Sequence, residues 1–273
     1  MEWYRERFAD KTVLVTGVSS GIGRAAAERL LAEGAQVVGA DIGEPPEFDD
    51  KELQTPRGFL FVHTDVREED AAVEAVSAAV EVGGRLDGVV HAAGVAGGAL
   101  LHLLDRQEWD RVLSVNLTGT FVVAKAALAQ MVSQDRIDGE RGAFVAVGGL
   151  SALEASSGGG VYGAASNGVV ALCRTLAIEY GRLGIRSNAV CPGIVNSSMT
   201  HSAFSAPGLR DIRASFRDSH ALQRFAEPEE VAAAALFLLT SDASFISGAA
   251  LMVDGGYSAG RDHGIANLFD IED

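Results

Sequence analysis

Lysine is scarce in this sequence. Only Lys11, Lys51 and Lys125 occur among 273 residues, and 37 acidic side chains outnumber 22 lysine and arginine side chains to give a formal net charge of −15. Nucleic acids and anionic membrane surfaces bind proteins through basic patches, because neutralised phosphates release counterions. The charge balance therefore argues against both partners and is typical of a soluble protein.

Cysteine and long apolar runs are also scarce. Cys173 and Cys191 are the two cysteines, and their apolar surroundings predict buried thiols rather than a disulfide or a metal site. The first eleven residues lack the apolar core of a signal peptide. The longest weakly charged stretch, residues 88–104, is interrupted by glycines and two histidines. We therefore predict a cytoplasmic, soluble protein without a membrane span.

Short β-branched runs alternate with longer helical patterns along the whole chain. The expected strands are 12–16, 36–41, 58–63, 86–92, 142–147, 185–190 and 249–253. The expected helices are 22–33, 68–82, 109–132 with a break near Asn116, 162–180 and 228–240. This alternation predicts one α/β domain with a mostly parallel sheet covered by helices on both faces.

Three segments do not fit the alternation. The acidic insert 43–58 is expected to be a surface loop. Residues 197–226 carry scattered charge with weak periodicity, which favours a flap over a site. Residues 258–273 form a C-terminal extension, for which the sequence suggests no definite role.

A glycine-rich turn, TGVSSGIG at residues 16–23, follows the first expected strand and opens a helix. Glycine lets the backbone turn sharply and approach a pyrophosphate, while the free N–H groups of the helix start attract the anion. An ordinary glycine-rich turn is the alternative. The pattern predicts a nucleotide site built from Gly17, Ser19, Ser20, Gly21, Ile22 and Gly23.

An acidic residue, Asp41, ends the second expected strand. A carboxylate at this position can accept hydrogen bonds from both adenosine ribose hydroxyls and repels a 2′-phosphate. Ile42 follows it, where a reader of NADP would carry a basic residue. The pair therefore predicts NAD(H), and the alternative is an aspartate that only forms the turn.

Together these motifs resemble the short-chain dehydrogenase/reductase family. The residues that carry the resemblance run in order from about Lys11 to Tyr257: TGVSSGIG, Asp41, Asp65-Val66, HAAG at 91–94, Asn116, Tyr162, PGIVNS at 192–197 and VDGGY at 253–257. The resemblance implies a single three-layer Rossmann-like domain, doubly wound, with about seven parallel strands. It also implies a homodimer or homotetramer.

The resemblance implies further cofactor contacts, by position. Asp65 and Val66 would flank the adenine ring. The lining of the cofactor would come from Ala92, Ala93 and Gly94, and the nicotinamide end would be held by Pro192, Gly193, Ile194 and Ser197. His91 stands where the family commonly has asparagine, and we interpret it as a packed polar residue rather than a catalytic one.

The catalytic positions implied by the resemblance are only partly filled. Tyr162 matches the acid/base and Asn116 matches the asparagine of the proton relay. The expected serine thirteen residues before the tyrosine is Gly149, and the expected lysine four residues after it is Ser166. Ser166 can still bond a ribose oxygen. Ser151 is a possible substitute for the missing serine, and a plain loop serine is the alternative.

A missing lysine affects the two reaction directions differently. An unperturbed tyrosine has a pKa of about 10, so about one phenol in a thousand is ionised at neutral pH. Alcohol oxidation needs the phenolate, whereas ketone reduction needs the neutral phenol. The first hypothesis is an NAD(H)-dependent oxidoreductase acting on a small secondary alcohol or ketone. The second is a nucleotide-binding homologue that serves as a sensor, a partner subunit or a non-redox enzyme using Tyr162, and the third is a structural protein without nucleotide.

Overall fold

Seven parallel strands form the centre of the protein. The structure, a computed structural model, describes residues 6–48, 58–205 and 208–260. Every neighbouring pair of strands in the sheet is parallel, in the order β3-β2-β1-β4-β5-β6-β7. The strands are β1 (Thr12–Thr16), β2 (Gln36–Asp41), β3 (Phe59–His63), β4 (Gly88–His91), β5 (Gly142–Val147), β6 (Ile185–Pro192) and β7 (Ala250–Val253).

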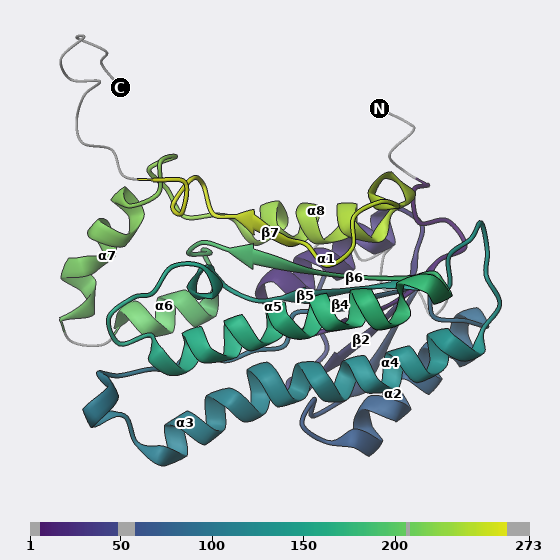
Figure 1. Ribbon diagram of the computed structural model, residues 1–273, viewed down its shortest axis with the longest axis horizontal. Helices are drawn as coiled ribbons and strands as arrows, with labels where there is room; N and C mark the ends of the chain where they lie inside the picture. The colour runs from purple at the N-terminus through teal and green to yellow at the C-terminus, as the bar shows by residue number, and fades with distance from the viewer. Residues whose placement is uncertain (1–5, 49–57, 206–207, 261–273) are drawn as a thin grey trace, which may run out of the picture.

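Helices cover both faces of this sheet (Figure 1). One face carries α2 (Glu69–Gly83), α3 (Arg106–Leu113), α4 (Gly119–Ser133) and α5 (Gly160–Tyr180). The opposite face carries α1 (Gly21–Ala32) and α8 (Pro228–Leu239), which pack against each other. Two further helices, α6 (Ser198–Ser205) and α7 (Leu209–Asp218), stand beyond the carboxyl ends of the strands.

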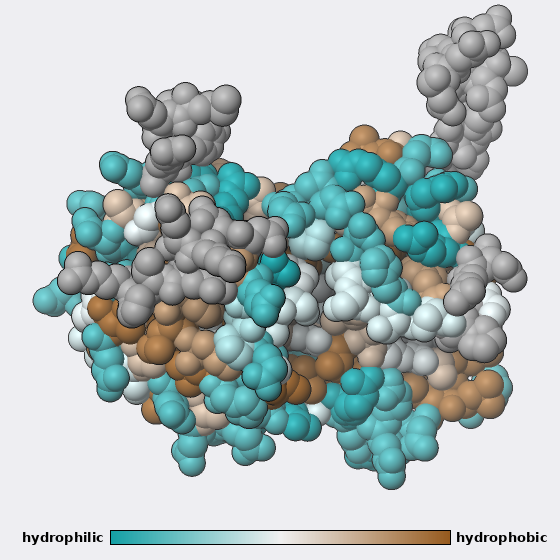
Figure 2. Space-filling model, turned by 180° about the vertical axis from the view of Figure 1, so that it is seen from behind, coloured by the Kyte–Doolittle hydropathy of each residue, from teal (hydrophilic) through white to brown (hydrophobic). Residues whose placement is uncertain are grey.

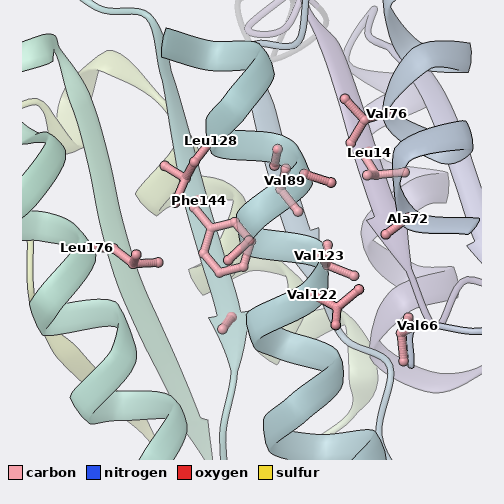
Figure 3. Packing of buried hydrophobic residues seen from close by; sticks show 14 of the residues in the cluster. Leu14, Val66, Ala72, Val76, Val89, Val122, Val123, Leu128, Phe144 and Leu176 are labelled. Carbon is pink, nitrogen blue, oxygen red and sulfur yellow. The ribbon is translucent and has the colours of Figure 1, made fainter. Parts of the chain in front are cut away.

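The core consists of two apolar layers, one on each side of the sheet. Alternate residues of β1 point to opposite layers, so that Leu14 faces α2 and α4 while Val13 and Val15 face α1 and α8. Phe144 of β5 is fully buried at the centre of the first layer, beside Val89 and Leu128 (Figure 3). Polar and apolar residues alternate over the back of the molecule, where much of the surface is hydrophilic (Figure 2).

The strand order reverses its direction between β1 and β4. The chain runs outward from β1 through β2 to β3, and then returns to add β4 on the other side of β1. In a doubly wound sheet, the connections that leave β1 and β4 diverge to opposite faces, and ligands bind between them at the carboxyl ends. The glycine turn follows β1 and residues 92–94 follow β4, so the fold brings these motifs together.

The predicted fold class is confirmed, and the differences are local. The expected break near Asn116 is absent, because a π-helical turn (Ser114–Thr118) joins α3 to α4. The segment expected as a flap contains two helices, and only residues 206–207 of it lie outside the described residues. Most of the predicted surface loop at 43–58 and of the C-terminal extension 258–273 also lies outside them.

Two helical stretches resemble membrane spans in length and composition, Arg106–Ser133 and Gly160–Leu183. Both belong to the layer that covers the sheet, and 50% and 39% of their most apolar windows are buried inside the domain. Core helices of soluble proteins have the same character. These two stretches therefore do not by themselves indicate a membrane protein.

Candidate functional site

The glycine turn is held so closely against the strand ends that side chains are excluded from it. Gly17 has a φ of +70°, and a Cβ atom added there would lie 2.7 Å from the backbone nitrogen of Ala93. A Cβ atom added at Gly23 would lie 2.6 Å from the carbonyl carbon of Gly17. Both positions therefore require glycine for the turn to fold in this shape.

The first turn of α1 has free N–H groups. Its N-cap, Ser20, has an extended backbone and makes no side-chain capping bond, and the first turn contains no acidic residue. The early N–H groups of a helix need a partner outside the helix, and their dipole favours an anion. The start of α1 thus has the character of an anion-binding helix terminus, and the phosphate contact of Gly21 and Ile22 stays a prediction.

The carboxylate of Asp41 is oriented by two backbone N–H groups. Ser19 donates to Oδ2 at 3.0 Å and Gly43 donates to Oδ1 at 2.9 Å. These bonds tie the end of β2 to the glycine turn and fix a negative charge beside it. Ile42 is 64% exposed and brings no charge of its own.

The two residues predicted to flank an adenine differ in their environment. Asp65 forms an ion pair with Arg67, with Nε at 2.9 Å from Oδ1, and this hydrogen bond holds the pKa of the carboxyl below its ordinary value. Val66 is 5% exposed and packs on α4, where a Cβ atom at Gly119 would lie 2.8 Å from Cγ2 of Val66. The side chain of Val66 is therefore part of the core.

Residues that follow β4 are fixed to β1 by a hydroxyl group. Thr16 Oγ1 accepts from the N–H of Ala93 at 3.2 Å and lies 2.8 Å from Nδ1 of His91. Burial lowers the pKa of His91 to about 4, so its ring is neutral. His91 is 1% exposed and stacks on Phe144, which agrees with the predicted packing role. Ala92 and Ala93 lie directly against Gly17.

Asn116 uses its side chain to hold the same segment. Its Oδ1 accepts from the N–H of Val95 at 2.8 Å, and its Nδ2 donates to the carbonyl of Val95 at 3.0 Å. The side-chain oxygen also lies beside Gly94, 3.5 Å from where a Cβ atom would be. The π-helical turn thus brings Asn116 to the end of β4, close to the residues predicted to line the cofactor.

The tyrosine, the glycine and the serine that were singled out by spacing lie together in the structure. A Cβ atom added at Gly149 would lie 2.9 Å from Cε1 of Tyr162, 3.4 Å from its hydroxyl and 3.2 Å from Oγ of Ser166. Ser166 is 4% exposed and lies one helical turn beyond Tyr162 on α5. The tyrosine ring therefore occupies the space beside Gly149.

The surroundings of Tyr162 favour its neutral form. Burial raises the pKa of the phenol above its ordinary value of 10.0, and the neighbouring thiol of Cys191 adds to the effect. Burial also raises the pKa of the Cys191 thiol, to about 11, and that of the Cys173 thiol, to about 12. Both cysteines are free and buried, as predicted, and both stay protonated at neutral pH.

Ser151 packs against α5 at Gly163 and Asn167. It belongs to the short helix Leu150–Ala152, and its carbonyl accepts from Nδ2 of Asn167 at 3.0 Å. Its Cβ lies 3.8 Å from where a Cβ atom of Gly163 would be. The contacts recorded for Ser151 thus involve the residue after Tyr162 and the next turn of α5.

The segment after β6 reaches the glycine turn. Ser197 Cβ lies 3.7 Å from where a Cβ atom of Gly21 would be, so this segment closes over the start of α1. Ile194 donates its N–H to Nε2 of His220 at 3.2 Å, and a Cβ atom at Gly193 would lie 2.7 Å from the same nitrogen. His220 was missed by sequence reasoning, because it follows α7 with no motif around it.

Two cavities of about 400 and 410 Å³ lie beside the helices of the expected flap. The first is lined by α7, Phe225 and Glu227, and the second by α6 and Arg213. Neither is lined by Tyr162 or by the glycine turn. The candidate site is therefore defined by the strand ends and their convergent motifs rather than by these cavities.

The fold and these strand-end motifs define a class, the Rossmann-like nucleotide-binding oxidoreductases. Residues 17–258 match the family model described as enoyl-(acyl carrier protein) reductase. The chain belongs to the short-chain dehydrogenase/reductase family, and dehydrogenases of this family use nicotinamide cofactors.

Named relatives of this family align along most of the chain. Meso-2,3-butanediol dehydrogenase from Serratia marcescens is 38% identical over 256 residues, which cover 93% of this chain and 96% of the relative. A protein named inactive 2-(S)-hydroxypropyl-CoM dehydrogenase 2, from Xanthobacter autotrophicus, is 38% identical over 72% of this chain and 84% of its own length. The crystal structure of levodione reductase superposes with a TM-score of 0.86 at 34% identity, covering 93% of this chain and all of that one.

Proposed function

We propose that the protein is an NAD(H)-dependent oxidoreductase that interconverts a small secondary alcohol and a ketone. The observation that supports the proposal is the turn at Gly17 and Gly23, which packs so closely on backbone atoms that neither position accepts a side chain, directly before the uncapped start of α1. Several relatives are named as dehydrogenases of hydroxylated compounds, including meso-2,3-butanediol dehydrogenase. We place the protein in the cytoplasm as a homodimer or homotetramer, without nucleic-acid or membrane partners.

The cofactor would lie across the carboxyl ends of β1 and β4. The pyrophosphate would be held by Ser19, Ser20 and the start of α1, and the adenine would lie near Asp65 and Val66. The carboxylate of Asp41 keeps two of its lone pairs engaged by backbone N–H groups and offers the others to ribose hydroxyls. Its charge opposes a 2′-phosphate, which favours NAD over NADP.

The nicotinamide end would be held by Ala92, Ala93, Gly94 and the segment Pro192–Ser197. When bound, the nicotinamide ring gives or takes the hydride of the reaction. Tyr162 donates a proton to the carbonyl oxygen of a ketone during reduction and accepts it during oxidation. Because its pKa is raised by burial, the neutral phenol dominates near pH 7 and reduction is the faster direction.

The neighbours of Tyr162 assist less than a serine and a lysine would. With glycine at 149, one hydrogen-bond donor to the substrate oxygen is missing, a loss of about 3 kcal/mol in comparable sites. Ser166 is assigned to a ribose hydroxyl, Asn116 to positioning the segment after β4, and Ser151 to a supplementary hydroxyl. We therefore expect slow turnover or an activated ketone as substrate.

A second function is favoured by one specific observation. Gly149 and Ser166 together leave Tyr162 without a cation or a hydroxyl partner of the expected kind, and one relative at 38% identity is itself named inactive. A nucleotide-binding homologue without alcohol turnover would need the glycine turn but not the tyrosine. Such a protein would bind NADH and act as a sensor or partner subunit.

NADH titration followed by a ketone panel separates these functions. We expect NADH to bind and at least one ketone to be reduced. Binding without turnover between pH 6 and 9 would favour the second function, and the absence of NADH binding would overturn both. A gain of activity in the Gly149→Ser, Ser166→Lys double variant would then indicate a lapsed enzyme. A loss of activity carries no such meaning, because a Cβ atom at Gly149 would lie 2.9 Å from the ring of Tyr162 and must displace it.

A further inference from the structure

A buried histidine joins three segments around the proposed nicotinamide end. His220 follows α7 directly and is 1% exposed. Its ring lies between the segment after β6, the last turn of α7 and the turn after β7. Nothing in its local sequence, DSHALQRF, marks it as functional.

The hydrogen bonds of His220 fix the tautomer and the orientation of its ring. Nε2 lies 3.2 Å from the N–H of Ile194 and therefore acts as an acceptor. Nδ1 lies 2.8 Å from the carbonyl of Phe216 and 3.2 Å from that of Arg217, so it carries the proton. The neutral Nδ1–H tautomer satisfies all three groups, and no other state does so.

The ring cannot easily turn away from this arrangement. Phe225 and Tyr257 pack edge-on against it with centroid distances of 5.9 and 5.0 Å. On the other side, Gly193 leaves space for Nε2 only because it lacks a side chain. His220 is thus clamped by two aromatic rings while it accepts the bond from Ile194.

We propose that His220 is a positioning residue that holds the segment Gly193–Ser197 in its cofactor-binding shape and couples it to α7. The inference rests on the proposed function, because that segment is assigned to the nicotinamide end. The carbonyl of Ile194 already accepts from the N–H of Ala226 at 2.9 Å. The segment is also tied to Val253 through the N–H of Gly193 and to Ala226 through the N–H of Asn196. The bond from the N–H of Ile194 to His220 is the anchor among these that links the segment to the residues after α7.

Loss of this anchor lowers the fraction of molecules in which the segment is ready to bind. The apparent dissociation constant for NADH rises in proportion as that fraction falls. One hydrogen bond of ordinary net strength corresponds to about a threefold to tenfold change. We expect a weakening of that size when the acceptor at the Nε2 position is removed.

Three substitutions separate the bond that Nε2 of His220 accepts from Ile194 from the bonds that Nδ1 donates to Phe216 and Arg217. His220→Asn keeps a donor near Phe216 but is too short to reach Ile194. His220→Gln extends to Ile194 with its carbonyl oxygen and gives up the bond to Phe216. His220→Phe keeps the ring packing and removes both bonds. We expect the Asn and Phe variants to bind NADH about threefold to tenfold more weakly and the Gln variant to bind nearly as the parent does.

Two measurements test the proposal, NADH affinity by calorimetry and amide exchange of residues 193–197 in the cofactor-free protein. Exchange at Ile194 should be faster in the Asn and Phe variants and close to the parent rate in the Gln variant. Met131→Ala is the matched control, because it truncates a fully buried side chain at the opposite end of the sheet. It should lower Tm without changing affinity or exchange at Ile194.

The outcomes distinguish the two proposals. If the parent protein fails to bind NADH, the proposed function is wrong, and the exchange measurement still tests the anchor. If the parent binds NADH but all three variants match it in affinity and in exchange at Ile194, the positioning role is overturned. A loss of affinity that merely follows Tm, as in Met131→Ala, would also overturn it.

Discussion

The two ends of the candidate site are built on different principles. Around Gly17 and Gly23 the geometry is set by the backbone, because no Cβ atom fits at either position. Around Tyr162 the geometry depends on side chains, and Gly149 and Ser166 leave that ring with few polar neighbours. The backbone therefore specifies the glycine turn, whereas side chains specify the surroundings of Tyr162.

This contrast explains how one end can change while the other is kept. A substitution that adds a side chain at the glycine turn would disturb β1, α1 and the end of β4 together, since all three meet there. A residue that changes beside Tyr162 alters charge and proton transfer but leaves the sheet intact. Binding can thus persist in a homologue whose chemistry has changed.

The largest expected effect comes from filling the turn. Gly17→Ala places a Cβ atom 2.7 Å from backbone atoms at a φ of +70°, so the turn must open and NADH binding should be lost in calorimetry. Gly181→Ala is the control, because a Cβ atom there meets nothing within 4 Å. Unchanged NADH affinity in Gly17→Ala would contradict the role of the glycine turn in cofactor binding. If Gly17→Ala fails to fold, Gly21→Ala offers a milder test, with strain at φ +54° but space for the Cβ atom.

The second prediction concerns pH and the tyrosine end. Burial raises the pKa of Tyr162 above 10.0. Below that pH, the fraction of phenolate, the form needed for oxidation, therefore increases steadily as the pH rises. The rate of alcohol oxidation should therefore rise about tenfold per pH unit, or about a hundredfold from pH 7 to 9. Ketone reduction, which needs the neutral phenol, should stay flat over the same range.

Initial rates in both directions at saturating cofactor check this prediction. Tyr162→Phe is the control, and it should remove the pH dependence together with most of the activity. A plateau in oxidation below pH 8 would mean that the phenol ionises far more easily than its burial implies. A cation near Tyr162 would then have to stabilise its phenolate.

The third prediction tests how the cofactor end chooses its ligand. Asp41→Asn removes the charge that Ser19 and Gly43 orient. Bonds to a charged acceptor are worth about 1.5 to 3 kcal/mol, so NADH should bind at least about tenfold more weakly. NADPH should bind better than it does to the parent, since the repulsion is gone. Asp70→Asn, an exposed change of equal charge, should leave both affinities as they are, and equal losses in both variants would contradict the assigned role.

The sequence predicts the cofactor end better than the tyrosine end. Glycines at 17, 21 and 23 and the acid at 41 are visible because backbone geometry restricts which residues fit, and the structure brings them together. The spacing of Tyr162, Gly149 and Ser166 is also readable, since helix periodicity places 162 and 166 on one face. The parallel sheet follows from the same strand and helix alternation, whereas the strand order comes from the structure.

Other features depend on contacts between distant segments and leave no local signal. His220 lies 26 residues from its partner Ile194, in a stretch that lacks a motif. The π-helical turn at Asn116 was expected as a break, because periodicity shows a disturbance there without showing that the helix continues. The role of Ser151 as a substitute hydroxyl stays a prediction, and the structure places this residue against Gly163 and Asn167 of α5.

The smallest expected effect comes from Ser166, which lies beside Tyr162 and is assigned to a ribose hydroxyl of the cofactor. If its hydroxyl holds a ribose, Ser166→Ala should weaken NADH binding about fivefold, which corresponds to one ordinary hydrogen bond of about 1 kcal/mol. Ser187→Ala is the matched control, since it removes another fully buried serine hydroxyl from β6. Equal NADH affinity in the parent and in Ser166→Ala would mean that Ser166 only fills space beside Gly149. In that case the cofactor would be held by the glycine turn and Asp41 without help from α5, and the separation between the two ends would be sharper than proposed.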